Sequence, residues 1–204
     1  MKLYVKKIAT CILGAFFMVG TLSGCSGSSV SSADYVKAVL DVAYCADDAD
    51  GNALDMSKDD VEKAKDGCIE KEAEFLTEYF NMEDVSDSTK KSLEGAAEKI
   101  FSSAKYTVEE KGDKVLVTIE PLKVLTDSLQ EYVDDFNVKK YVEADDSCTE
   151  EKFVDGVTKE LEKSAEAAEY EKKVEIEIAV TKKDGKYTVS DEDLSAIDDA
   201  MFVY

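Results

Sequence analysis

The stretch AKYTVEEKGDKVLVTIEP, residues 104–121, is where the apolar pattern changes from helical spacing to strict alternation. Its alternating apolar side chains are Tyr106, Val108, Val115, Val117 and Ile119. Alternation of period two is typical of a strand with one buried face, and a Gly-Asp pair suits a two-residue hairpin turn. We therefore expect two strands joined at Gly112-Asp113, the second of which ends at Pro121.

A second hairpin is predicted near the end of the chain. Its first strand alternates at Val174, Ile176, Ile178 and Val180, with Glu175, Glu177 and Ala179 between them. Asp184-Gly185 provides the turn, and Tyr187 and Val189 continue the returning strand. Two hairpins with one polar face each predict a single antiparallel sheet of four strands with an apolar side that helices cover.

Helical spacing of apolar residues predicts about six helices around this sheet. The expected ranges are 33–45, 59–80, 87–103, 124–142, a helix opened by a Ser147–Glu150 capping box, and a last helix capped by Ser190 to Asp193. Ser32 is the expected cap of the first helix. The fold class is therefore α+β, with one domain over residues 33–204.

The N-terminus carries an export signal. Lys2, Lys6 and Lys7 precede an apolar run from Ile8 to Gly20, which is shorter than the roughly 20 residues that a membrane-spanning helix needs. The run leads into Leu22-Ser23-Gly24-Cys25, which closely resembles the lipobox of bacterial prolipoproteins. The resemblance implies a signal peptide over residues 1–24, a diacylglyceryl group on the Cys25 thiol, and a Ser/Gly tether over residues 25–32.

Such an anchor predicts where the protein works. Two acyl chains hold a protein stably on a bilayer, whereas one chain does so only marginally. We therefore expect a chain that is bound to the cell membrane through Cys25 and faces the extracellular side. The alternative is an ordinary secretory signal with a chance cysteine at this position.

Charge and missing residue types narrow the functions further. Removal of residues 1–24 takes away three of the 25 lysines and none of the 46 acidic residues, which leaves a formal charge of 22 minus 46, or −24. The chain has no Arg, His or Trp. This charge excludes nucleic acid as a partner, and the lack of histidine excludes Ser-His-Asp and Cys-His catalysis and His-based metal sites. We expect no catalytic residue set and no cofactor.

Several segments resemble a group of small Gram-positive lipoproteins of unassigned function. These segments are ADYVKAVLD at residues 33–41, AEF at 73–75, the hairpin at 104–121, and KDGKY at 183–187. The resemblance covers nearly all of the mature chain and implies a cystatin-like or nuclear-transport-factor-like α+β domain, in which helices wrap a curved sheet. It brings no assigned catalytic residues.

Three cysteines remain after Cys25, in a compartment where disulfides persist. Cys45 and Cys68 are candidates for a bond between the first two helices, which would stabilise the fold by roughly 3 kcal/mol. The alternative is that Cys68, which lies on an apolar stripe, is a small core residue. Cys148 would then be the odd thiol.

The acidic loop at residues 47–55 raises the possibility of a weak calcium site. Asp48, Asp50 and Asn52 have oxygen ligands at alternate positions, as calcium loops do, but Ala53 stands where the loop motif has glycine. The alternative is an acidic connection between two helices without a metal.

We expect a non-enzymatic binding or interaction protein with a protein or small-molecule ligand, and two other classes stay open. One is an enzyme with a small-molecule pocket on a nuclear-transport-factor-like fold, lined by Tyr106, Tyr132, Tyr141 and Tyr187 and with Glu120 as the most interesting carboxylate. The other is a calcium-tuned adhesion module. An open polar pocket with a buried carboxylate favours the enzyme, whereas a filled sheet interior and an exposed apolar patch favour a protein partner.

The anchor is directly testable. Cys25→Ala removes the thiol that accepts the lipid, so we expect it to abolish palmitate labelling and to release or mislocalise the protein. Cys11→Ala, in the part that the peptidase removes, is the matched control and should leave labelling intact. Continued labelling of Cys25→Ala would contradict the assignment.

Overall fold

The computed structural model describes residues 30–82, 85–183 and 185–204. The predicted signal peptide, Cys25 and residues 26–29 of the tether lie outside this part of the chain. The described residues form an α+β fold with six α-helices and antiparallel sheets, which confirms the predicted class and the helix count. No helix among them is both long enough and apolar enough to cross a membrane.

The α-helices share one kind of start. They are α2 (Ser32–Ala43), α3 (Lys58–Tyr79), α4 (Asp87–Ser102), α5 (Asp127–Asn137), α6 (Glu150–Ala167) and α7 (Asp191–Met201). Each begins after a serine or threonine whose side chain accepts a hydrogen bond from a backbone N–H of the first turn, at Ser31, Ser57, Ser86, Thr126, Thr149 and Ser190. These caps satisfy backbone donors that have no partner within the helix.

The predicted caps were wrong by one or two residues in two helices. Ser31 rather than Ser32 caps α2, and Thr149 rather than Ser147 caps α6. Two short helical segments complete the set, a 3-10 turn η1 (Gly51–Leu54) and a π-helical turn η2 (Val138–Val142) that continues α5.

The central hairpin forms as predicted. Strand β1 (Lys105–Lys111) pairs antiparallel with β2 (Lys114–Glu120), with Lys111 opposite Lys114, so that Gly112-Asp113 is the two-residue turn. Gly112 has a φ of 67°, which a residue without a side chain adopts without strain. The second strand ends before Pro121, as expected.

The prediction of one four-stranded sheet is wrong. The main sheet has three strands in the order β1-β2-β4, where β4 is Val174–Ile178, and β5 (Val180–Lys183) pairs with β6 (Lys186–Val189) as a separate ribbon. The regular pairing stops at Ala179, which lies between β4 and β5 in no strand. The strand predicted over residues 174–180 is therefore divided between two sheets.

A further pair of strands, which the sequence did not predict, joins the middle of the chain to its C-terminal residues. Strand β3 (Leu122–Lys123) pairs in parallel with β7 (Phe202–Val203), the end of the chain. Val203 O also accepts hydrogen bonds from the backbone N–H groups of Val124 and Leu125. These bonds engage the backbone of Val124 and Leu125 outside a helix, so α5 begins at Asp127 and not at Val124 as predicted.

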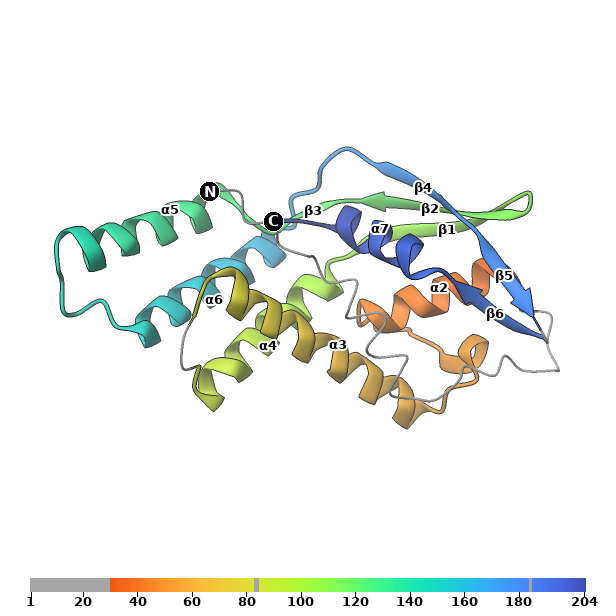
Figure 1. The fold of residues 1–204 in the computed structure, drawn as a ribbon, viewed down its shortest axis with the longest axis horizontal. Helices are drawn as coiled ribbons and strands as arrows, with labels where there is room; N and C mark the ends of the chain where they lie inside the picture. The colour runs from red at the N-terminus through yellow and green to blue at the C-terminus, as the bar shows by residue number, and fades with distance from the viewer. Residues whose placement is uncertain (1–29, 83–84, 184) are drawn as a thin grey trace.

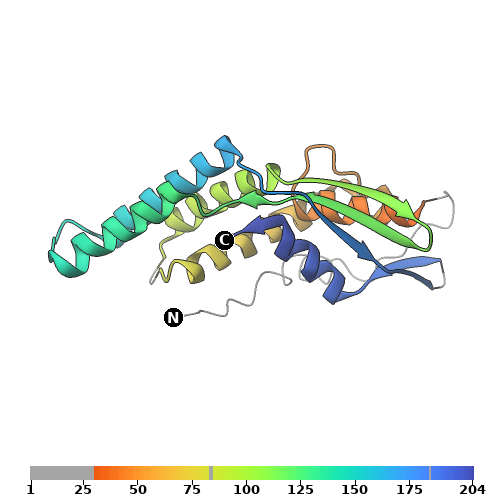
Figure 2. The same cartoon turned by 90° about the horizontal axis from the view of Figure 1, so that it is seen from above.

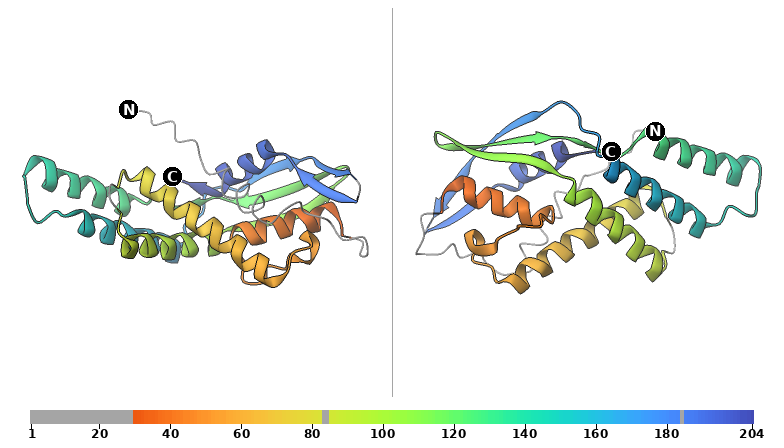
Figure 3. Two further views of the ribbon diagram at one scale, coloured as in Figure 1. Left: turned by 60° about the horizontal axis from the view of Figure 1, so that its bottom comes forward. Right: turned by 180° about the vertical axis from the view of Figure 1, so that it is seen from behind.

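The apolar face of the sheet is filled. Helices α2 and α7 lie against it, and Figure 1 and the rear view in Figure 3 show both on the same side of the strands. The β2 side chains on this face are fully buried, at Val115, Val117 and Ile119. The opposite face is open to solvent and carries ion pairs such as Lys111–Glu177. The filled interior satisfies the condition that favours an interaction protein.

The remaining helices form a second layer that extends beyond the sheet. Helix α4 packs against both α3 and α6, and α5 packs on α6. Figures 1 and 2 show the α5–α6 pair as a hairpin that reaches away from the sheet and gives the molecule its long shape. This hairpin and the end of α3 frame the groove described below.

Ile119→Ala should test the filled sheet face. The side chain is fully buried against the covering helices, so its truncation should lower the free energy of unfolding by about 2 to 5 kcal/mol in a denaturant titration. Thr118→Ala, the neighbour on the solvent face, should cost less than about 1 kcal/mol. Equal effects of the two changes would contradict the facing of this strand.

Candidate functional site

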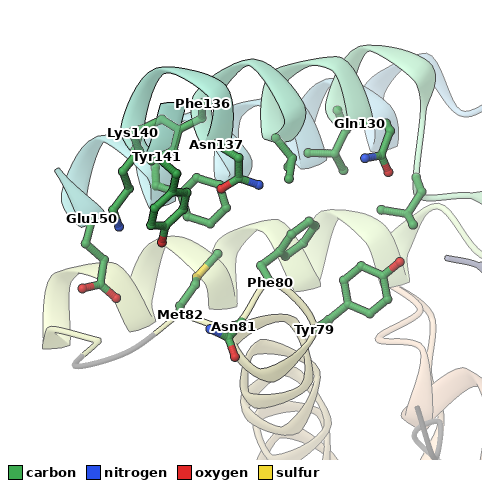
Figure 4. A pocket seen from close by; sticks show the side chains of 14 residues that line it. Tyr79, Phe80, Asn81, Met82, Gln130, Phe136, Asn137, Lys140, Tyr141 and Glu150 are labelled. Atoms are coloured by element: carbon green, nitrogen blue, oxygen red, sulfur yellow. The ribbon is translucent and has the colours of Figure 1, made fainter. Parts of the chain in front are cut away.

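A groove of about 710 Å³ opens between the end of α3 and the α5–α6 hairpin. Figure 4 shows α5 above the groove and the last turn of α3 below it. Most of its lining is apolar or aromatic, from Tyr79, Phe80, Met82, Leu125, Leu129, Val133, Phe136, Tyr141 and Phe153. Its polar lining comes from Asn81, Gln130, Asn137, Lys140 and Glu150.

The floor of the groove is set by the way α3 ends. Phe80 is the C-cap, and Asn81 follows with a φ of 50°, a left-handed conformation that asparagine tolerates. Figure 4 shows Phe80 and Met82, on either side of Asn81, pointing into the groove. The Tyr79 and Phe80 rings meet edge to face at 5.1 Å, which fixes their positions.

The outer end of the groove is the π-helical turn η2. It directly follows Asn137, the last residue of α5, and ends the helical part of this segment. Here the turn leaves three large apolar side chains in water, with Tyr141 exposed by 71%, Val142 by 77% and Val138 by 48%. In Figure 4 the Tyr141 ring points across the groove toward Met82. This apolar tip is the part of the described surface that most lacks a covering element.

A glycine allows the two helices of the hairpin to pack closely. A side chain at Gly156 of α6 would collide with the ring of Tyr132 from α5. The close approach lets the Tyr132 hydroxyl donate a 2.8 Å hydrogen bond to the backbone carbonyl of Lys152. Gly156 and Tyr132 thereby hold α5 at the distance from α6 that leaves the groove open.

The helical hairpin that carries the groove is strongly acidic. The carboxylates on α5, on the connection to α6 and at the start of α6 are Asp127, Glu131, Asp134, Asp135, Glu143, Asp145, Asp146, Glu150 and Glu151, of which Glu150 lines the groove. Lysines are fewer there, and Lys140 already lies over the Tyr141 ring at 5.2 Å. The hairpin therefore carries a net negative charge, which favours a cationic ligand near it.

A buried acid is connected to the groove residue Tyr79 through Tyr204. Glu72 of α3 is fully buried, and its Oε1 accepts a hydrogen bond from the hydroxyl of Tyr204, the last residue. Among the described residues, Glu72 Oε2 is a buried oxygen without a hydrogen-bond partner. Burial raises the Glu72 pKa to about 8; the bond from Tyr204 opposes this rise and the Asp198 carboxylate adds to it. Glu72 is therefore largely protonated at neutral pH.

A second hollow of about 390 Å³ lies beside β1 and α2 and contains a buried carboxylate, Asp41. Asp41 Oδ1 accepts from the Tyr106 hydroxyl at 2.8 Å, and Asp41 Oδ2 from Lys37 Nζ at 2.6 Å. Burial and the Asp41 charge raise the pKa of Tyr106 far above its ordinary value. Glu120 at the edge of the hollow pairs with Lys173 at 3.0 Å. These acids are engaged within the fold, so the hollow does not resemble a prepared acid–base site.

The four tyrosines predicted to line one pocket do not come together. Tyr141 lines the groove, whereas Tyr106 lies at the second hollow. Tyr132 packs on α6, and Tyr187 donates a hydrogen bond to Val30 O at the far end of α2. The prediction of a shared tyrosine pocket is wrong, because these residues belong to different ends of a long molecule.

Cys45 and Cys68 are both buried, Cys148 is half-buried, and each of the three carries a thiol. Burial raises the pKa of the Cys45 thiol to about 12 and raises that of Cys68 as well. Both thiols are thus poor nucleophiles. The disulfide between them stays a prediction.

The acidic loop folds as a capped turn. Asp50 is the N-cap of η1, where its two oxygens accept from the backbone N–H and the side-chain amide of Asn52. Gly51 is pressed against Val61 and Met56, which leaves no space for a side chain. Over the described residues, no three acidic, cysteine or histidine side chains are placed to hold a metal ion. The weak calcium site at Asp48, Asp50 and Asn52 stays a prediction.

Comparison with known proteins adds no family assignment. The chain matches no protein-family model, no curated protein and no solved structure. The resemblance to Gram-positive lipoproteins with a cystatin-like or nuclear-transport-factor-like domain therefore stays a prediction. The function has to be argued from the groove itself.

Gly156→Ala should disturb the groove. The added methyl group displaces the Tyr132 ring and separates α5 from α6, so we expect a loss of about 1 to 3 kcal/mol in the free energy of unfolding. Gly95→Ala is the matched control, because a side chain at Gly95 of α4 meets no atom within 4 Å. It should stabilise by about 0.5 to 1 kcal/mol, as alanine does in an exposed helix. A neutral or stabilising Gly156→Ala would contradict the packing.

Proposed function

We propose that the protein is a lipid-anchored binding module on the extracellular face of the cell membrane, whose groove takes an amphipathic helix with basic flanks from a partner protein. The observation that carries this proposal is the groove itself, which has aromatic and apolar side chains interspersed with polar ones in its lining, an exposed apolar tip and a place on an acidic helical hairpin. The membrane anchor on Cys25 rests on the lipobox.

The shape of the groove suits a helix. It runs along α5 and η2, which together span residues 127–142, and ends against the last turn of α3. An amphipathic helix binds such a groove by burying anchors at i, i+3, i+4 and i+7. Aromatic rings such as Tyr79, Phe80 and Tyr141 are the residues that most often carry binding energy at protein interfaces.

The charge near the groove determines which residues are expected beside the apolar face of a bound helix. The α5–α6 hairpin is rich in acidic side chains, and the mature chain has a formal charge of −24. An acidic partner would be repelled, whereas lysine or arginine residues beside the apolar face of a bound helix would be attracted to the hairpin and would associate faster. The side-chain amides of Asn81, Gln130 and Asn137 offer further hydrogen bonds to polar groups of the bound helix.

The competing enzyme function has less support. The sheet interior is filled, and Asp41 in the polar hollow is already bonded to Tyr106 and Lys37. A general acid or base needs a proton that can move to a substrate, and these groups hold one another instead. Binding therefore explains the described surface better than catalysis.

Binding of a defined probe tests the proposal. The full-length lipidated protein in phosphatidylcholine vesicles should bind a fluorescent lysine/leucine amphipathic helix of about 14 residues, with protein-free vesicles as the background. The same helix with glutamate in place of lysine should not bind. Tyr141→Asp should weaken binding at least about tenfold, because Tyr141 is the exposed aromatic anchor.

Val174→Asp is the matched control for charge. The Val174 side chain is 38% exposed and lies on β4, whereas Tyr141 lies on η2. Replacement of Val174 by aspartate adds the same negative charge as Tyr141→Asp. It should leave the affinity unchanged within about twofold. Equal losses from the two variants, or equal binding of the lysine and glutamate helices, would contradict the proposed groove.

A further inference from the structure

The C-terminal residues of the chain hold residues that line the groove. Strand β7 ends at Val203, whose carbonyl oxygen accepts from Val124 N at 3.0 Å and from Leu125 N at 3.3 Å. Leu125 lines the groove. The backbone of the last residues thus fixes the position of a groove residue through two hydrogen bonds.

The last side chain supports the opposite wall. The Tyr204 ring packs edge to face on Phe75 of α3, with ring centres 5.0 Å apart, and lies 5.9 Å from the ring of Tyr79. Tyr79 lines the groove and contacts Phe80, its neighbour in the lining. A row of aromatic rings therefore runs from the chain end to the floor of the groove.

Tyr204 is held in this row from inside the core. Its hydroxyl donates to Oε1 of Glu72, a carboxyl group without solvent exposure whose other oxygen has no hydrogen-bond partner among the described residues. Such a site accommodates a neutral carboxylic acid and penalises a carboxylate, because water cannot reach the charge.

From these contacts we infer that Glu72 is a positioning residue for the groove. Protonated Glu72 holds Tyr204 and the β7 segment against α3 and Leu125, and loss of its proton drives this segment to open. The inference concerns the same groove as the proposed function and relies on it only for the view that this wall serves binding.

The neighbouring ionisable groups reinforce this behaviour. Asp198 of α7 is buried near Glu72 and accepts a hydrogen bond from Tyr44 at the end of α2, at 3.3 Å. Cys68 lies on the same side of α3, and its thiol pKa is raised chiefly by burial, with a contribution from Asp198. A second negative charge beside Asp198 would add repulsion to the cost of burial, so ionisation of Glu72 favours an opened segment in which water reaches it.

The direction of the pH effect follows from linkage. Glu72 has a raised pKa of about 8 in the closed segment and its ordinary lower value once the segment opens. The closed segment therefore binds more protons between these two values. Each unit of pH in that interval should favour opening by about tenfold, and the effect should level off above about pH 8.

Hydrogen exchange measures this opening without any ligand. We would follow residues 122–125 by mass spectrometry, in the full-length lipidated protein in phosphatidylcholine vesicles, from pH 6 to 9, with rates corrected for the intrinsic effect of pH. Protection of Val124 and Leu125 should fall about a hundredfold between pH 6 and 8 and then level off. The β1–β2 hairpin is the internal control and should keep its protection.

Two variants separate positioning from a merely structural role. Glu72→Gln keeps an oxygen that accepts from Tyr204 but cannot ionise, so the pH dependence at residues 122–125 should disappear. Tyr204→Phe removes the hydrogen bond that lowers the pKa of Glu72 and keeps the packed ring. Protection of residues 122–125 should therefore continue to fall up to a higher pH than in the wild type before it levels off.

The role of Glu72 and the helix-binding function are tested by separate results. A pH response that is equal in the wild type and Glu72→Gln, or that is absent in the wild type, would overturn the role of Glu72. If Glu72→Gln does not fold, an unmoved profile in Tyr204→Phe would overturn it equally. The exchange experiment uses no peptide, so its result does not depend on helix binding. If the groove failed to bind the lysine/leucine helix, the role of Glu72 would not be contradicted.

Discussion

The parallel pairing of β3 with β7 is the constraint on which the arrangement of the molecule depends. It joins the residue after Pro121 to the last residues of the chain, and so ties the end of the central hairpin to the end of α7. It also helps to place the start of α5, because Val124 and Leu125 take their backbone partners from Val203. This short pairing lies where the sheet, whose inner face is buried, meets the groove, which is open to solvent.

Much of the fold follows from local sequence patterns, and the parts that do not follow have a common cause. The Gly112-Asp113 hairpin and the six helices depend on residues close in sequence, since alternation, helical spacing and caps are local signals. The break at Ala179 and the β3–β7 pair depend on partners far away in the chain, and a two-residue strand has too few residues to show a period. The single four-stranded sheet was predicted because alternation from Val174 to Val180 continues across a break that only tertiary pairing imposes.

The candidate site was less visible in the sequence. The acidic composition was evident from the sequence, but the groove was not, because α3 and α5 are brought together by α4 and α6. One signal was available: Glu72 is four residues from both Cys68 and Leu76, on the stripe of α3 that faces the core. A carboxylate at such a position predicts a buried acid that needs a partner, and that partner, Tyr204, lies at the other end of the sequence. The π-turn at Val138–Val142 has no comparable signal, although its VKKYV sequence places apolar residues next to lysines.

The most direct test of the binding function is a photo-cross-linking residue at position 141 in the full-length protein on intact cells, with position 174 as the comparison. The cross-linked partner peptide is sequenced by mass spectrometry. The groove predicts an adduct specific to position 141, on a segment with apolar residues at helical spacing and lysine or arginine beside them. Adducts that are shared with position 174, that contain only lipid, or that carry an acidic segment would contradict it.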